Sequence, residues 1–358
     1  MFINIPEKLS KAATGIGSLP DIGEKKALKL IQKNFPLCPH WPQFPTRPAE
    51  YYDNQCLYLL KEMNIIKKET GKNPRFLDQD IEFLDNVAVF YEMYLENIDA
   101  EQLDKKLAVP LESAPGFYHF IKHLEKNGVK DAVCVKGQSA APLTAGMQVL
   151  NEEGSSSFFN EQLRDLVVKA LELHVIWQVR ELKKLGLPVI IFLDEGMMQV
   201  YGSKEFLSLR GDWISNSFRT IMDAIKREGA VPGIHACCMT DWSVLLPTDP
   251  GIINLDVYNY FNSLLTAVDQ LDSFLEKGGY IAWGIVPVND ACFQETSDTL
   301  IQRLEGYLEK LTARGVNERL LTQQMIITPS CGTGLYSPET AEQVYRLTAE
   351  TSQRFNLL

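Results

Sequence analysis

The chain has 358 residues, of which 45% are hydrophobic and 23% are charged, which is typical of a folded globular protein rather than a disordered one. Its 35 basic and 46 acidic residues give a formal net charge of −11, so it lacks the basic surplus that nucleic acid or an anionic membrane requires. No apolar run reaches the roughly 18 residues of a membrane span, and residues 1–9 have no apolar core typical of a signal peptide. We therefore expect a soluble cytoplasmic protein without nucleic-acid or membrane partners.

Seven short apolar runs, without alternation of polar residues, predict buried parallel strands. In chain order they are residues 12–17, 132–136, 188–193, 231–236, 252–256, 280–286 and 324–328. An eighth, weaker candidate at residues 87–91 fits a helix equally well. Amphipathic stretches lie between these runs; one of them, residues 213–228, ends at Gly229, a residue type that favours helix termination.

From residue 130 onward, strands and helices alternate, which predicts a parallel sheet covered by helices. Seven strands and one weaker candidate fit the α/β class with a (β/α)8 TIM barrel, a fold that typically takes about 250 residues. The residues beyond this typical length fall between residues 19 and 130, where only the weak strand candidate occurs. We therefore expect one TIM-barrel domain over residues 1–358, with a long insertion in the first βα connections at about residues 19–130. A proline-rich stretch at residues 36–45 lies in this insertion and is unsuited to a helix.

Several candidate metal ligands stand at the ends of predicted strands, where parallel barrels carry their active sites. His235 and Cys237 are two positions apart, so their side chains share one face of a strand and form half of a zinc site. Cys331 and Asp256 end two further strands whose ends converge on the same cavity. The seven cysteines are scattered and odd in number, which does not fit a disulfide framework. The alternative is that these thiols only pack in the core, as free cysteines often do.

Two acids, Asp194 and Glu195, directly follow a wholly apolar strand. Burying a carboxylate there costs free energy unless it has a partner. One of them could bind a substrate ammonium group or act as a base. A helix-cap or salt-bridge role is an equally good interpretation. Two Gly-x-Gly turns, at residues 15–17 and 332–334, lack the third glycine of a dinucleotide-binding fingerprint, and the chain has no phosphate-binding loop or Gly-x-Ser-x-Gly elbow.

Taken in order, these motifs resemble the catalytic barrel of cobalamin-independent methionine synthase. This family belongs to a superfamily with uroporphyrinogen decarboxylase and the corrinoid-dependent thiol methyltransferases. The matching segments are Thr-Gly-Ile-Gly-Ser-Leu-Pro at residues 14–20, Leu-Asp-Glu at 193–195, His-Ala-Cys at 235–237 and Pro-Ser-Cys-Gly at 329–332. Gly196 stands where the family has a proline after the acid pair. The family has two barrels and about twice this length, whereas this chain has room for one.

The resemblance implies a zinc ion bound by His235, Cys237 and Cys331, with Asp256 where the family has a glutamate ligand. It also implies a homocysteine site, formed by Ile16, Gly17, Ser18 and Asp194, with Glu195 beside them. In the implied reaction, zinc lowers the pKa of the substrate thiol, and the resulting thiolate attacks a methyl group. Asp194, the candidate catalytic residue, would pair with the ammonium group and orient the sulfur.

The methyl donor and the acceptor leave several interpretations open. The folate site of the family has no counterpart that we find in this chain, so methylcobalamin, free or on a partner corrinoid protein, is the expected donor. The acceptor is homocysteine or another small thiol such as coenzyme M, although a sulfonate would favour Arg or Lys where Asp194 and Glu195 stand. A third interpretation is a uroporphyrinogen-decarboxylase-like enzyme, which needs arginines near the N-terminus that this chain largely lacks. A fourth is a corrinoid- or zinc-binding module without catalysis.

Overall fold

The computed structural model describes residues 5–50, 55–69, 71–129 and 131–356. At its centre is a curled parallel sheet whose six strands follow chain order. They are β3 (Val135–Ala140), β4 (Val189–Glu195), β5 (Val231–Ala236), β6 (Ile252–Leu255), β7 (Tyr280–Val286) and β8 (Met325–Pro329). Every residue of these strands is buried except the half-buried Asp194. Burial on both faces explains why most of the strands are continuous apolar runs in the sequence.

Two extended segments bond to the free edges of this sheet. Residues 11–14 pair with β8, where the N–H of Ile327 donates to the carbonyl of Ala12 at 2.8 Å. Residues 37–41 pair with β3, where the N–H of Lys136 donates to the carbonyl of Pro39 at 3.0 Å. Just beyond these two segments the chain also bonds to itself, because the N–H of Gln43 donates to the carbonyl of Gly17 at 3.1 Å. Together with the six strands they form a barrel-like α/β fold.

The prediction of eight strands is only partly confirmed. Residues 12–17 contain one isolated bridge, at Ala13, rather than a regular strand, and the proline-rich stretch, for which we predicted no strand, pairs with β3. Prolines have no N–H to donate, so a segment rich in them can pair only intermittently. The weak candidate at residues 87–91 is wrong as a strand, because it lies within helix α4 (Phe83–Asn97), whose core-facing side is buried.

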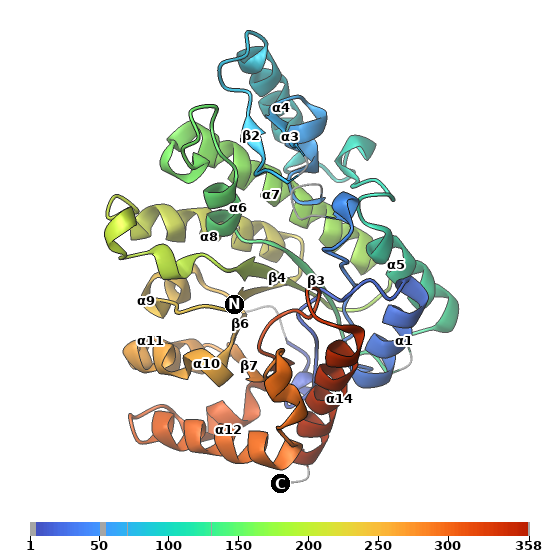
Figure 1. Cartoon of the computed structure of the whole chain (residues 1–358), viewed down its shortest axis with the longest axis vertical. Helices are drawn as coiled ribbons and strands as arrows, with labels where there is room; N and C mark the ends of the chain where they lie inside the picture. Colours follow the sequence, from blue (N-terminus) through green and yellow to red (C-terminus); the bar gives the residue numbers. More distant parts are fainter. Residues whose placement is uncertain (1–4, 51–54, 70, 130, 357–358) are drawn as a thin grey trace.

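Helices cover the outer face of the sheet, and the part of the insertion that contains α3, β2 and α4 projects at one end of the molecule (Figure 1). In the insertion, α3 (Tyr58–Glu62), the short hairpin β1 (Ile66–Lys67) and β2 (Arg75–Phe76), and α4 follow one another. The other helices are α1 (Glu24–Asn34), α5 (Pro115–Asn127), α6 (Pro142–Gln148), α7 (Glu161–Lys183), α8 (Gly211–Arg227), α9 (Trp242–Leu245), α10 (Val257–Tyr260), α11 (Val268–Glu276), α12 (Ser297–Thr312), α13 (Glu318–Gln323) and α14 (Pro338–Phe355).

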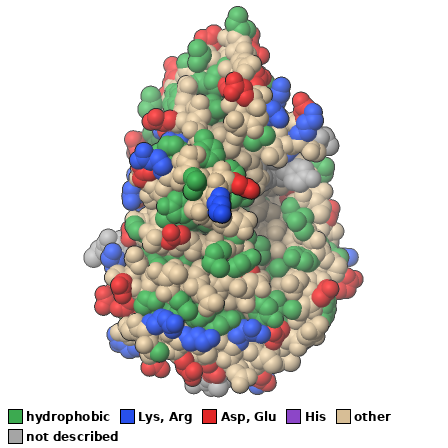
Figure 2. Space-filling view, turned by 60° about the vertical axis from the view of Figure 1, so that its left-hand side comes forward, with side chains coloured by type: hydrophobic (Ala, Val, Ile, Leu, Met, Phe, Trp, Pro, Cys, Tyr) green, Lys and Arg blue, Asp and Glu red, His purple; other side chains and the backbone are tan. Residues whose placement is uncertain are grey.

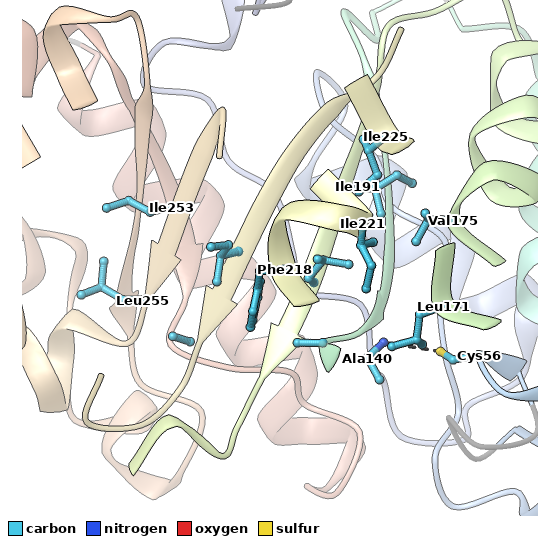
Figure 3. Close-up of a cluster of buried hydrophobic side chains, with 14 of the residues drawn as sticks. Cys56, Ala140, Leu171, Val175, Ile191, Phe218, Ile221, Ile225, Ile253 and Leu255 are labelled. Carbon is cyan, nitrogen blue, oxygen red and sulfur yellow. Dashed lines mark hydrogen bonds between the residues drawn. The ribbon is translucent and has the colours of Figure 1, made fainter. Parts of the chain in front are cut away.

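The main hydrophobic core lies between the outer face of the sheet and the helices. Figure 3 shows Ile191 of β4 and Ile253 of β6 on this face, with side chains of α7 and α8 such as Val175 and Ile221. Each is fully buried or nearly so, and burying a side chain of this size stabilises the fold by roughly 1.5–3 kcal/mol. This core fixes the strands on which the candidate site is built.

A second apolar cluster lies on the opposite face of the strands, inside the barrel. It includes Ile190 and Phe192, which alternate with the outward-facing residues of β4, together with Val231, Ile252, Tyr280 and Ile326 from the following strands. These side chains fill the interior toward the N-terminal ends of the strands. On the same face, polar side chains lie mostly nearer the C-terminal ends, although β3 has Lys136 at its second position.

The molecular surface has no dominant charge on the face shown in Figure 2, where acidic and basic side chains are interspersed and hydrophobic ones lie between them. The charge of −11 is therefore not gathered into a single acidic region on this face.

Within the described ranges, none of the helices combines the length and the apolar character that crossing a bilayer requires.

Candidate metal centre

The inward-facing positions become polar toward the C-terminal ends of the strands. Asp194 of β4 is the register partner of His235 of β5, and His235 is in turn the partner of Asn254 of β6. Register partners in parallel strands share a face, so these three side chains form a row across the inner face of the sheet. Thr328 of β8 joins this row through a hydrogen bond from Asn254.

Three of the four predicted metal ligands meet at this end of the barrel. One ligand atom from each of His235, Cys237 and Cys331 lies within 4.8 Å of the other two. His235 is at the end of β5 with Cys237 two residues later, and Cys331 comes just after β8. His235 is buried, whereas both cysteines are half-buried and so reachable from outside. An imidazole and two thiols at this spacing fit zinc, which takes nitrogen and sulfur ligands.

His235 presents a free nitrogen to the two cysteines. Its Nδ1 bonds to the side-chain oxygen of Asn254, while its Nε2 is buried and has no hydrogen-bond partner in the part of the chain that the structure describes. A buried polar atom without a partner costs free energy, so it usually marks a strained or functional site. A metal ion between His235 and the thiols would satisfy this nitrogen.

The two thiols are electrostatically linked. Their mutual hydrogen bond, together with burial, raises the pKa of Cys237, and the same hydrogen bond lowers the pKa of Cys331. The two sulfurs thus share a proton through this hydrogen bond. Burial acts to lower the pKa of His235, but the adjacent Cys237 sulfur and Asp194 carboxylate outweigh it and raise that pKa overall. A cation that entered the cluster would displace the shared proton.

Asp194 lies beside the cluster with an unused acceptor. Its Oδ1 is buried and makes no hydrogen bond to any described residue. Burial raises the pKa of this carboxyl group, and the nearby His235 and Lys136 partly offset that effect. A carboxylate oxygen in this condition can accept a hydrogen bond from a bound cationic group such as an ammonium.

Asp256, the predicted fourth ligand, is near the cluster but outside the group of three found among the described residues. It follows β6 and caps helix α10: its Oδ1 accepts the N–H of Asn259 at 3.0 Å, and its Oδ2 accepts that residue's side-chain amide at 2.7 Å. Its charge still affects the pKa of Cys331. Both oxygens are thus committed to the cap.

Glu195 faces away from the cluster, because it is adjacent to the inward-facing Asp194 on a strand. Its Oε1 accepts hydrogen bonds from the Thr144 hydroxyl at 2.8 Å and the Met197 N–H at 2.6 Å, and its Oε2 accepts the Thr144 N–H at 3.2 Å. Burial raises its pKa to about 7. The structure therefore does not place Glu195 with the predicted substrate-binding residues; it joins α6 to the loop after β4, as in the helix-cap interpretation.

The predicted substrate loop of Ile16, Gly17 and Ser18 lies against the turn that follows Cys331. The carbonyl of Ser18 accepts the N–H of Thr333 at 2.9 Å, and the Ser18 hydroxyl accepts the N–H of Gly334 at 3.2 Å. Gly17 has φ +152°, and a Cβ there would lie 2.6 Å from the Gln138 side chain. Only glycine fits this position, so the Gly17 backbone runs directly against β3.

Two buried polar residues of this region, Lys136 and Asn254, were not selected by the sequence analysis. The Nζ of Lys136 donates to the Ile16 carbonyl at 2.5 Å and lies 4.7 Å from the centre of the Phe192 ring. Burial lowers its pKa to about 8. The available signal was the polar pattern of β3, in which Lys136 and Gln138 alternate as interior residues do.

Comparisons with known proteins do not assign an activity. No protein family model and no curated protein matches the chain. A B12-independent methionine synthase from Shewanella sp. W3-18-1 aligns over 67% of each chain with 14% identity and a TM-score of 0.46. A GH20 catalytic module of the pneumococcal exo-β-D-N-acetylglucosaminidase StrH aligns over 98% of this chain and 86% of that chain, with 11% identity and a TM-score of 0.48. Similarities of this size, shared by unrelated reactions, do not single out a function.

Proposed function

We propose that the protein is a zinc-dependent methyltransferase that moves a methyl group to the thiol of homocysteine and forms methionine. The observation that carries the proposal is the meeting of His235, Cys237 and Cys331 at the C-terminal end of the sheet. These three residues would hold a zinc ion, and three protein ligands are typical of catalytic rather than structural zinc sites. The order of motifs in the sequence, which resembles the catalytic barrel of cobalamin-independent methionine synthase, supports the same ligands.

In this proposal each residue of the centre has a distinct task. Zinc, when bound, supplies thiol activation, because it lowers the pKa of a coordinated thiol. His235 and the two cysteines hold the ion, and the partial exposure of the cysteines leaves a route for the thiol. Asp194 accepts a hydrogen bond from the substrate ammonium and so orients the sulfur. The backbone of Ile16, Gly17 and Ser18 forms the wall next to Cys331.

Asp256 could act as a fourth metal ligand only under one condition. Its carboxylate would become a ligand only by exchanging its contacts with Asn259 for the metal. We propose that Asp256 would help to hold the ion only after such an exchange, in keeping with its position near Cys331. The sequence resemblance implies a glutamate ligand at this same position.

The proposed methyl donor is methylcobalamin, either free or carried by a corrinoid protein. This choice rests on the residues of this chain, among which we find no counterpart of the family's folate site. Another small thiol as acceptor, such as coenzyme M, is less compatible with the site, because its sulfonate would face the unpartnered carboxylate of Asp194. We also infer that the two irregular segments at residues 11–19 and 37–43 stand in the first two positions of a (β/α)8 barrel.

Methyl transfer tests the proposal directly. The zinc-reconstituted protein is incubated with methylcobalamin and either homocysteine or coenzyme M, and the methylated thiol is quantified. We expect methionine formation that is lost in Cys331→Ser and retained in Cys292→Ser, a matched change at a buried cysteine outside the cluster. Transfer to coenzyme M but not to homocysteine would overturn the acceptor, and equal activity of Cys331→Ser and the unaltered protein would overturn the site.

A further inference from the structure

Asn254 is the residue that contacts the imidazole of His235 from the side opposite the cysteines. It is fully buried in β6 and is the register partner of His235. Its side-chain oxygen bonds to Nδ1 of His235. Its amide nitrogen donates to the carbonyl of Ala282 and to the hydroxyl of Thr328, each at 2.7 Å. Both amide hydrogens are therefore used.

These two donated hydrogen bonds determine the orientation of the amide. A flipped amide would place the side-chain oxygen of Asn254 against the Ala282 carbonyl, two acceptors with no hydrogen between them. The oxygen must therefore face His235, and an acceptor at that position requires a hydrogen on Nδ1. In the neutral imidazole this leaves the lone pair on Nε2, which is the buried nitrogen without a partner among the described residues.

We propose that Asn254 is a positioning residue of the metal centre, which fixes His235 in the Nδ1–H tautomer and so presents Nε2 to Cys237 and Cys331. Partners of this kind, on the far nitrogen of a ligating histidine, orient the ring and set its tautomer. Thr328 lies on β8, three residues before Cys331, which follows the end of that strand. One amide thus connects the strand that carries the imidazole with the strand that leads to the second thiol.

The inference rests on the proposed function only for the identity of the ion. The tautomer itself is a property of the metal-free chain, because every contact that determines it is a hydrogen bond within the protein. Its test can therefore succeed or fail independently of methyl transfer.

The first measurement is the pair of imidazole ¹⁵N chemical shifts of His235 in the reduced, metal-free protein, at a pH where the ring is neutral. We expect a protonated Nδ1 and an unprotonated Nε2. The opposite tautomer in the unaltered protein would overturn the inference without any variant, so the test does not depend on a variant that folds.

Variants then measure what the contact contributes. In Asn254→Leu, which keeps the branching and the number of heavy atoms of the side chain and loses the amide, we expect a mixture of tautomers and a rise of about 10- to 100-fold in the zinc dissociation constant, measured by chelator competition. Thr328→Val should act in the same direction but less, because the Ala282 carbonyl still holds one amide hydrogen. Thr348→Val is the matched control, since it removes a buried hydroxyl that donates to Val344 on α14, away from the centre.

The outcomes separate the two proposals. An unchanged tautomer and an unchanged zinc affinity in Asn254→Leu would overturn the positioning role. Failure of all forms to bind zinc, with the tautomer shifting as expected, would overturn the proposed function and support the fixing of His235 by Asn254. Equal losses in Thr348→Val would show a general destabilisation and overturn the positioning role.

Discussion

Replacing Asp194 by asparagine tests how the site would recognise an amino-acid thiol. The change keeps the size of the side chain and removes the charge from a buried oxygen that has no partner among the described residues. A hydrogen bond to a charged group contributes about 1.5–3 kcal/mol, and 1.4 kcal/mol corresponds to a tenfold change in affinity. We therefore expect the KM for homocysteine to rise roughly 10- to 100-fold.

The assay separates this effect from damage to the metal centre. Asp194 is not one of the three clustered ligands, so the zinc content of Asp194→Asn should equal that of the unaltered protein. Asp241→Asn is a suitable control, because Asp241 is an exposed cap of α9, the helix after β5, and asparagine caps helices equally well. An unchanged KM in Asp194→Asn, or a loss of zinc, would refute the ammonium-binding role.

Two further predictions concern stability. Burial raises the pKa of Glu195 from the ordinary value of 4.5 to about 7, so the folded protein binds this proton more tightly than the unfolded chain does. The free energy of unfolding should therefore decrease as the pH rises from 4.5 to 7. In Glu195→Gln this decrease should be smaller, as measured by denaturant titrations at several pH values. The remaining decrease is due to Glu50, whose burial also raises its pKa to about 7. A decrease as steep as in the unaltered protein would contradict the assignment to Glu195. Tyr345→Phe removes the hydroxyl that bonds Nε2 of the buried His40 at 3.0 Å and should lower the free energy of unfolding by about 1–3 kcal/mol. Tyr336→Phe, at an exposed site, should have no such effect, and equal stabilities of the two variants would refute the account.

The sequence predicted the part of the fold where burial is uniform. The run at residues 231–236 and the run at 280–286 coincide with β5 and β7, because both faces of these strands are covered and polar residues are few. β3 begins three residues later than predicted and extends to Ala140. Its interior positions hold Lys136 and Gln138, and polar residues facing into a barrel interrupt the apolar pattern on which the prediction depended.

The candidate site was predictable where alternation along a strand decides which side chains meet. His235 and Cys237 are two residues apart and do share a face, as expected. The same rule, applied to the neighbouring residues Asp194 and Glu195, shows that only one of them can face the interior. Asp256 is different: its commitment to the cap of α10 depends on the turn after β6, which no strand pattern reveals.

The central claim is that His235, Cys237 and Cys331 together bind one zinc ion, and elemental analysis of the reduced, reconstituted protein tests it most directly. We expect about one zinc per chain, and at least a strong weakening of zinc binding in Cys237→Ser and Cys331→Ser. Cys134→Ser is the control, because Cys134 is a buried cysteine of the apolar cluster inside the barrel. A protein that takes up no zinc after reduction and reconstitution, or that binds it equally well without either clustered thiol, would contradict the account.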